Sequence, residues 1–132
     1  MANIPTDRRY ADTGEWARWE SDGSVTVGFS APLAKAEDSR DEMLVLVLPE
    51  VGRTVRAEEE VDGWESVLRA GQYHSPVGGQ VTAVNQQVSE DPGYISFDPY
   101  EVWIFKIKPS SRTDFDDLQD AAAYTAYIAE PE

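Results

Sequence analysis

The chain has 132 residues, which is enough for one domain with a hydrophobic core and too few for two domains of ordinary size. Hydrophobic residues make up 41% of the sequence, which favours a globular protein, and the formal net charge is -14. Because this charge repels phosphate backbones and anionic lipid heads, nucleic acid and membrane surfaces are excluded as partners, and a basic protein surface is favoured.

The sequence contains no cysteine, which excludes disulfide bonds, thiolate metal sites and a cysteine nucleophile. Residues Met1 to Tyr10 lack the apolar segment of a secretion signal, and nowhere do about eighteen apolar residues follow one another. We therefore expect a soluble, cytoplasmic protein.

Two apolar segments in the first half of the chain predict strands. In residues 25–29, apolar and small or polar residues alternate, and the preceding turn Asp22-Gly23 indicates a hairpin. Residues 43–49, MLVLVLP, are apolar up to the proline and predict a fully buried strand at the centre of the core, with a short core helix as the alternative. The charged segment 31–42 between them predicts a solvated loop or helical turn.

The second half of the chain predicts two further strands, at 81–84 and 102–107. Alternate residues from Trp103 to Lys108 are expected on opposite faces of the second strand. Between the two strands, proline and glycine residues predict a long loop at about 86–101.

The C-terminal segment predicts a helix over about residues 113–129. Thr113 and Asp116 form a capping pair at its start, and the alanine-rich stretch continues it after a break near Asp120. Many short strands with glycine and proline turns, followed by one terminal helix, indicate a mainly β fold, a small sandwich or flattened barrel.

Seven short segments along the chain carry a family resemblance. They are GEW (14–16), DGSVTVG (22–28), LPEVG (48–52), ESVLRA (65–70), SPVGGQVTAVN (75–85), DPY (98–100) and WIFKIK (103–108). Together, and in this order, they resemble the H protein of the glycine cleavage system. The resemblance implies a single lipoyl-type hybrid barrel-sandwich domain over residues 1–132 with a C-terminal helix.

The resemblance also implies a function. In this family a tight hairpin presents a lysine that is linked to lipoic acid, and the arm visits a pyridoxal-dependent decarboxylase, an aminomethyltransferase and a dihydrolipoamide dehydrogenase. The carrier performs no catalysis, so we expect that this chain is not an enzyme.

The hairpin tip departs from the family pattern. The family reads ESVKA, and the corresponding residues here are Glu65, Ser66, Val67, Leu68, Arg69 and Ala70. Without a gap, the attachment lysine falls on Leu68, whose aliphatic side chain cannot form an amide. The neighbouring Arg69 stays protonated and is a poor acyl acceptor. We therefore expect no lipoate and no other cofactor.

Five residues are candidates for contact with a partner protein: Glu15, Trp64, Leu68, Arg69 and His74. Glu15 matches the family glutamate that holds the loaded arm in a surface cleft, although an inherited strand residue is the favoured reading. Trp64 either anchors a partner or folds back onto the sheet. His74, the single histidine, is more often a solvated side chain than a base or ligand.

Other candidate sites carry weaker signals. The acidic groups 58–60 and 116–117 lack the alternating oxygen pattern of a cation loop, so we expect solvated charges and no metal. Ser66 as a site for an acyl or phosphopantetheine group, and Lys35 as an alternative lipoylation site, stay open.

Three functional hypotheses result. The first is a non-lipoylated, monomeric H-like adaptor of a decarboxylase-like or aminomethyltransferase-like enzyme with a basic face, in glycine cleavage or a specialised biosynthetic pathway. The second is a lipoyl carrier modified on another lysine. The third is a stand-alone enzyme that uses His74, Glu15 and an aspartate for acid and base catalysis.

Overall fold

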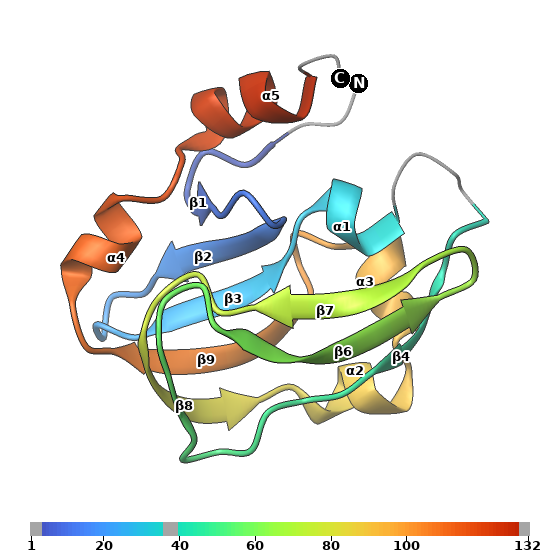
Figure 1. Cartoon of the computed structure of the whole chain (residues 1–132), viewed down its shortest axis with the longest axis horizontal. Helices are drawn as coiled ribbons and strands as arrows, with labels where there is room; N and C mark the ends of the chain where they lie inside the picture. The colour runs from blue at the N-terminus through green and yellow to red at the C-terminus, as the bar shows by residue number, and fades with distance from the viewer. Residues whose placement is uncertain (1–3, 36–39, 130–132) are drawn as a thin grey trace.

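Two antiparallel β-sheets face each other in the computed structural model, which describes residues 4–35 and 40–129 (Figure 1). The six-stranded sheet has the order β1 (Arg9–Tyr10), β2 (Glu15–Trp19), β3 (Val25–Phe29), β9 (Trp103–Pro109), β8 (Gly79–Val84) and β5 (Thr54–Val55). The three-stranded sheet has the order β4 (Met43–Leu46), β6 (Glu60–Ser66) and β7 (Ala70–His74). The predicted mainly β sandwich with a helical C-terminus is confirmed.

The first hairpin, β2 with β3, forms where the sequence predicts it. Gly23 in the turn has a φ of 87°, a conformation that costs glycine little. The side chain of Asp22 accepts a 2.9 Å hydrogen bond from the backbone N–H of Ser24, which closes the turn. This hairpin places Glu15 and Trp16 on β2 opposite the end of β3.

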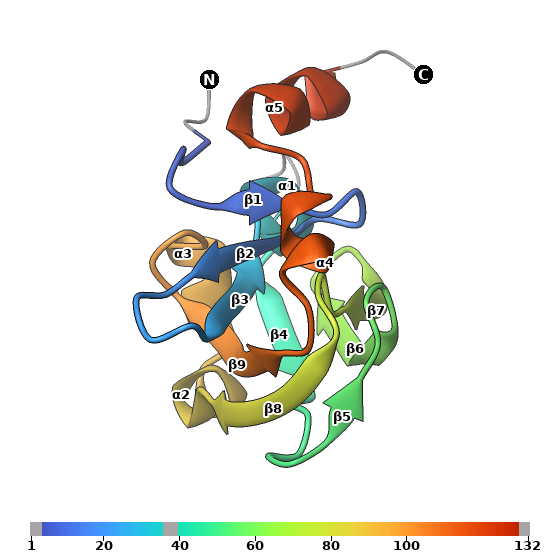
Figure 2. The same cartoon turned by 90° about the vertical axis from the view of Figure 1, so that its left-hand side faces the viewer.

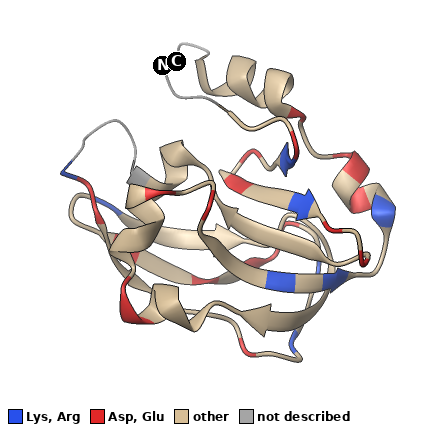
Figure 3. Ribbon diagram, turned by 180° about the vertical axis from the view of Figure 1, so that it is seen from behind, with Lys and Arg blue, Asp and Glu red and all other residues tan. Residues whose placement is uncertain are grey.

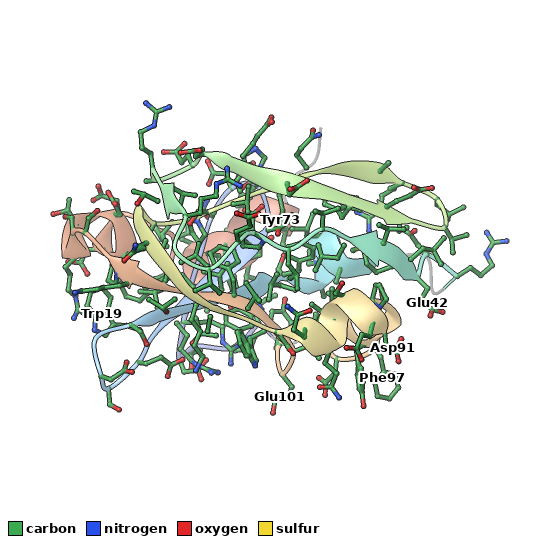
Figure 4. The ribbon with its side chains drawn as sticks, turned by 90° about the horizontal axis from the view of Figure 1, so that it is seen from below. Trp19, Glu42, Tyr73, Asp91, Phe97 and Glu101 are labelled. Carbon is green, nitrogen blue, oxygen red and sulfur yellow. The ribbon has the colours of Figure 1, made fainter. Side chains whose placement is uncertain are left out.

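The core lies between the two sheets. All of β3 is buried, and so are Phe105 and Ile107 on β9. Tyr73 of β7 reaches between the layers (Figure 4), where its ring packs 5.3 Å from the Phe29 ring and its hydroxyl donates to the Val47 carbonyl at 2.6 Å. A buried hydroxyl with a partner allows this tyrosine to join the two layers without leaving a polar group unsatisfied.

The prediction of a fully buried central strand at residues 43–49 is wrong. Strand β4 ends at Leu46 and lies at the edge of the smaller sheet, with Leu44, Val45 and Val47 exposed. A bulge between Met43 and Val45 shifts the register, so that only one face of the strand meets the core. An unbroken apolar run predicts a buried strand, but it carries no information on the edge position.

The predicted long loop at about 86–101 contains two short helices, α2 (Gln86–Glu90) and α3 (Gly93–Phe97). Asn85 caps α2 by accepting a hydrogen bond from the N–H of Gln87 at 3.2 Å. Val88 and Ile95 from these helices join the same buried cluster as Ile104 of β9.

The C-terminal segment forms two helices, α4 (Arg112–Asp116) and α5 (Ala121–Ala129), with the predicted break before Ala121. Ser111 and not Thr113 is the N-cap of α4, since its hydroxyl accepts from the Thr113 N–H at 3.1 Å. Helix α5 packs beside β1 (Figure 2), where Tyr124 stacks on Tyr10 with ring centroids 4.7 Å apart. Helix α1 (Ala31–Lys35) begins the segment 31–42 and agrees with the predicted helical turn, although Ala34 is buried. Residues 36–39 of this segment lie outside the described part of the chain.

Charged residues are distributed unevenly over the surface. Among the helices and strands, acidic residues occur on β2, β6, α2 and α4, and many others lie in the loops. Lysine and arginine are seen on β1, β2, β9 and α4 and in several loops (Figure 3). Within residues 4–35 and 40–129, no helix is long and apolar enough to cross a membrane.

Candidate functional site

The turn of the β6–β7 hairpin places Leu68 at its tip. Glu65 pairs with Ala70, and the Ser66 N–H donates to the Arg69 carbonyl at 2.7 Å, which leaves Val67 and Leu68 as a two-residue loop. The Leu68 side chain is 55% exposed. The hairpin thus presents an aliphatic side chain at the end of the molecule that lies opposite α4 (Figure 1).

Asp41, which the sequence analysis missed, holds this tip in place. Its side chain is 1% exposed, and its two oxygens accept hydrogen bonds from the Leu68 N–H at 3.0 Å and from the Arg69 guanidinium. Hydrogen bonds from the Ser66 hydroxyl, the Leu68 N–H and Arg69 hold the pKa of Asp41 below its ordinary value. Asp41 is 27 residues from Leu68 in sequence, so no local pattern indicates this contact.

The Arg69 side chain is bound to its own protein. Besides Asp41, it donates to the carbonyl oxygens of Pro32 at 3.3 Å and Leu33 at 2.9 Å, at the start of α1. Its guanidinium carbon lies 5.0 Å from the centroid of the Trp64 ring. The Arg69 side chain therefore connects the hairpin to α1 and does not extend freely into solvent.

Trp64 and Ser66 both face inward on β6. Trp64 is 8% exposed and its indole N–H donates to the Gln72 carbonyl at 3.3 Å, which matches the reading in which it folds back onto the sheet. The Ser66 hydroxyl is buried, accepts a 3.0 Å hydrogen bond from the Arg69 N–H and lies 3.2 Å from the Arg69 carbonyl. Neither side chain is presented to a partner at the tip.

Two further predicted residues, Glu15 on β2 and His74 on β7, lie next to each other in the structure. Glu15 is fully buried, and its carboxylate accepts hydrogen bonds from the Thr13 hydroxyl and, at 2.8 Å, from the His74 backbone N–H. The His74 Nδ1 atom lies 3.5 Å from the same carboxylate. Burial raises the pKa of Glu15, and the hydrogen bonds from Thr13 and His74 offset part of this rise.

An acidic cleft of about 370 Å³ opens beside this pair. Thr13 and His74, which both bind Glu15, contribute to its wall. Its other lining residues include four acids: Asp12, Glu58, Asp114 and Asp117. The sequence analysis grouped Glu15 and His74 only in the enzyme hypothesis, and their 59-residue separation gave no sign that they meet.

One member of each acidic group suggested by the sequence has a protein partner. Glu59 accepts from the Arg56 N–H at 2.9 Å and lies 3.4 Å from the Arg53 guanidinium, and Asp116 pairs with Arg112 at 3.4 Å. Across the described ranges, no group of three or more histidine, cysteine, aspartate or glutamate side chains is placed to hold a metal ion.

The hairpin tip does not fit a covalently attached lipoyl group. Such a group requires a primary amine, and the tip offers the side chains of Val67, Leu68 and Arg69. Lys106, one of the three lysines of the sequence, lies on β9 in the other sheet with its amine 5.3 Å from the Trp103 ring.

Comparison with known proteins supports the resemblance over almost the whole chain. The family model described as glycine cleavage H-protein matches residues 8–131. The chain is similar to glycine cleavage system H protein 2 of Pseudomonas aeruginosa, with 44% identity over 97% of each chain, and to that of Pseudomonas putida, with 43% identity over 98% of this chain and all of the relative. The crystal structure of a glycine cleavage system H protein from Mycobacterium marinum superposes with a TM-score of 0.83 at 30% identity, covering 96% of this chain and 100% of that one.

These matches correct the prediction that the chain takes no lipoate. H proteins carry lipoate, and the similarity extends far beyond the single tip position on which that prediction depended. The leucine at position 68 excludes attachment of lipoate at the hairpin tip only. It does not exclude attachment to Lys35, Lys106 or Lys108.

The same matches show whether the chain is an enzyme and to which family it belongs. H proteins are carriers and not enzymes, so the prediction that this chain is not an enzyme is confirmed. The fold has the two sheets and the hairpin that the resemblance implies, and the matches extend over almost the whole chain. The chain belongs to the glycine cleavage H-protein family.

Proposed function

We propose that this chain is a monomeric, non-catalytic partner of a glycine-cleavage-type enzyme, either a decarboxylase or an aminomethyltransferase. The observation that carries the proposal is the β6–β7 hairpin, whose two-residue tip is exposed while its backbone is fixed by Asp41. A fixed and exposed tip can enter a partner's surface without losing much conformational freedom.

The partner is expected to offer a basic face. The formal net charge of -14 accelerates encounter with a positively charged protein and disfavours encounter with an acidic one. Service in a specialised biosynthetic pathway, in place of glycine cleavage itself, stays a prediction.

Isothermal titration tests the proposal. The decarboxylase and the aminomethyltransferase of glycine cleavage from Pseudomonas aeruginosa, where a 44% identical relative occurs, are titrated separately with this chain. We expect saturable one-to-one binding to at least one of them, weakening as salt is raised because charge contributes to it. An unrelated basic protein of similar size is the control for attraction by charge alone, and absence of binding to both enzymes would contradict the proposal.

A further inference from the structure

Helix α3 exposes two aromatic rings on one face. Phe97 is 83% exposed, more than any other large hydrophobic side chain in residues 4–35 and 40–129, and it projects away from the molecule (Figure 4). Tyr94 is 44% exposed and lies three residues earlier, so the two rings are neighbours on the helix surface. Ile95 and Ser96 between them are buried and hold the helix on the core.

A groove of about 210 Å³ lies beside Tyr94. Trp103, Val102 and Glu101 contribute to its wall, and the Asn85 side-chain amide fixes that wall by donating to the Trp103 carbonyl at 2.8 Å. The groove is smaller than the roughly 300–1,000 Å³ that is typical of pockets for small organic ligands. Its size therefore suits one side chain of another protein better than a cofactor.

The surroundings of the two rings are acidic. The Tyr94 N–H donates to the Asp91 carbonyl at 3.2 Å, and the Asp98 N–H donates to the Tyr94 carbonyl at 3.0 Å, which keeps both acids close to this ring. Asp91 and Glu101 project on the same side of the molecule as Phe97 (Figure 4). Four exposed acidic residues belong to this segment: Glu90, Asp91, Asp98 and Glu101.

These charges are not neutralised by the protein itself. Between Arg69 and Lys106 the sequence contains no lysine or arginine. Among the described residues, none of the four carboxylates forms an ion pair. The Lys106 amine lies 5.3 Å from the Trp103 ring, whereas the two rings of α3 have no cation against them in the same part of the chain.

Arginine is the side chain that matches both properties of this surface. Its planar guanidinium stacks on aromatic faces, and its five N–H groups donate to carboxylates. Nucleic acid and anionic lipid would be repelled by the acids. A second copy of this chain would bring another net charge of -14, at an electrostatic cost.

We infer that this chain binds an arginine-rich segment of a partner protein on the α2–α3 surface, defined here as Asp91, Tyr94, Phe97, Asp98 and Glu101. One guanidinium stacks on the α3 rings, and neighbouring arginines pair with the acids. The surface belongs to elements other than the β6–β7 hairpin, so this inference goes beyond the proposed function and does not depend on it.

Nuclear magnetic resonance titration with a short synthetic peptide that alternates arginine and leucine tests the inference. We expect the largest amide shifts at residues 90–103, and no comparable shifts with the same peptide carrying neutral citrulline in place of arginine. Phe97→Ser should weaken binding about fivefold through loss of the ring contact. Glu101→Lys should weaken it by a similar factor and flatten its dependence on salt.

Two exposed positions elsewhere provide matched controls. Tyr127→Ser removes an aromatic ring from α5 that is 45% exposed, and Glu50→Lys reverses an exposed charge in the turn before β5. Both should bind the peptide like the wild type. Because all four substituted residues are exposed, thermal unfolding followed by circular dichroism should show that every variant is folded.

Three results would overturn the inference. The first is absence of shifts at residues 90–103, or equal shifts with the citrulline peptide. The second is equal weakening by Phe97→Ser and Tyr127→Ser, or by Glu101→Lys and Glu50→Lys, which would show attraction by charge or apolar area alone. The third is a wild-type dimer in analytical ultracentrifugation that Phe97→Ser dissociates, because the occupant would then be a second copy.

Discussion

At the scale of single residues, Glu15 has the most unusual environment. Its carboxylate is fully buried on β2 and its pKa is raised by that burial, so the folded chain holds the carboxyl proton more tightly than the unfolded chain does. The stability that this group contributes is therefore present below the ordinary pKa of 4.5 and is lost as the pH rises through the higher folded value.

Glu15→Gln removes this ionisation while keeping an oxygen that can accept from the His74 N–H. We expect the variant to have a higher Tm than the wild type at neutral pH, and the difference to shrink on acidification below about pH 4.5. Circular dichroism melts across a pH series measure this. Glu65→Gln, at an exposed glutamate of β6, is the matched control, and a difference that grows toward acid pH would refute the reasoning.

At the scale of elements, the β6–β7 hairpin presents the residue at its tip from a fixed backbone. Leu68 is exposed at the bend of a two-residue loop, and its N–H is held by Asp41. A lysine at this position would project its amine from the same fixed backbone into solvent.

Leu68→Lys is therefore expected to become lipoylated at the tip when it is produced with a lipoate ligase and lipoate. Peptide mapping by mass spectrometry should show one lipoyl group on the tip peptide of the variant, and an unmodified tip peptide in the wild type, where any lipoyl group maps to a lysine elsewhere. Leu44→Lys, which adds an exposed lysine beside the hairpin, controls for modification of any accessible amine. An unmodified variant tip would mean that the hairpin is no longer recognised as an attachment site.

Elements that depend only on residues close together in the sequence could be predicted from it. The Asp22-Gly23 turn, strand β3 and the break before α5 follow from neighbouring residues, and the structure places them as expected. The edge position of β4 could not be predicted in this way, because it depends on a bulge and on the strand that pairs with it.

The candidate site could be predicted only in part, for the same reason. The motif ESVLRA located the hairpin tip, but Asp41 and the carbonyl oxygens of Pro32 and Leu33 approach it from 27 to 37 residues away. The meeting of Glu15 with His74 likewise depends on packing between the two sheets. Such contacts are set by the tertiary fold and leave no periodic signal in the sequence.

At the scale of the whole molecule, both the net charge and the position of the hairpin favour binding to a larger protein. The chain combines a net charge of -14 with an exposed hairpin tip whose backbone is held by Asp41. An acidic carrier of this shape is suited to bind a larger protein end-on through its hairpin.

Hydrogen–deuterium exchange of the chain, alone and saturated with the enzyme it binds, tests the central claim most directly. Docking through the tip of the β6–β7 hairpin predicts slower amide exchange at residues 65–70, with exchange in β9 and α5 unchanged. Slower exchange confined to β9, β8 or α5, with none at the hairpin tip, would contradict the account.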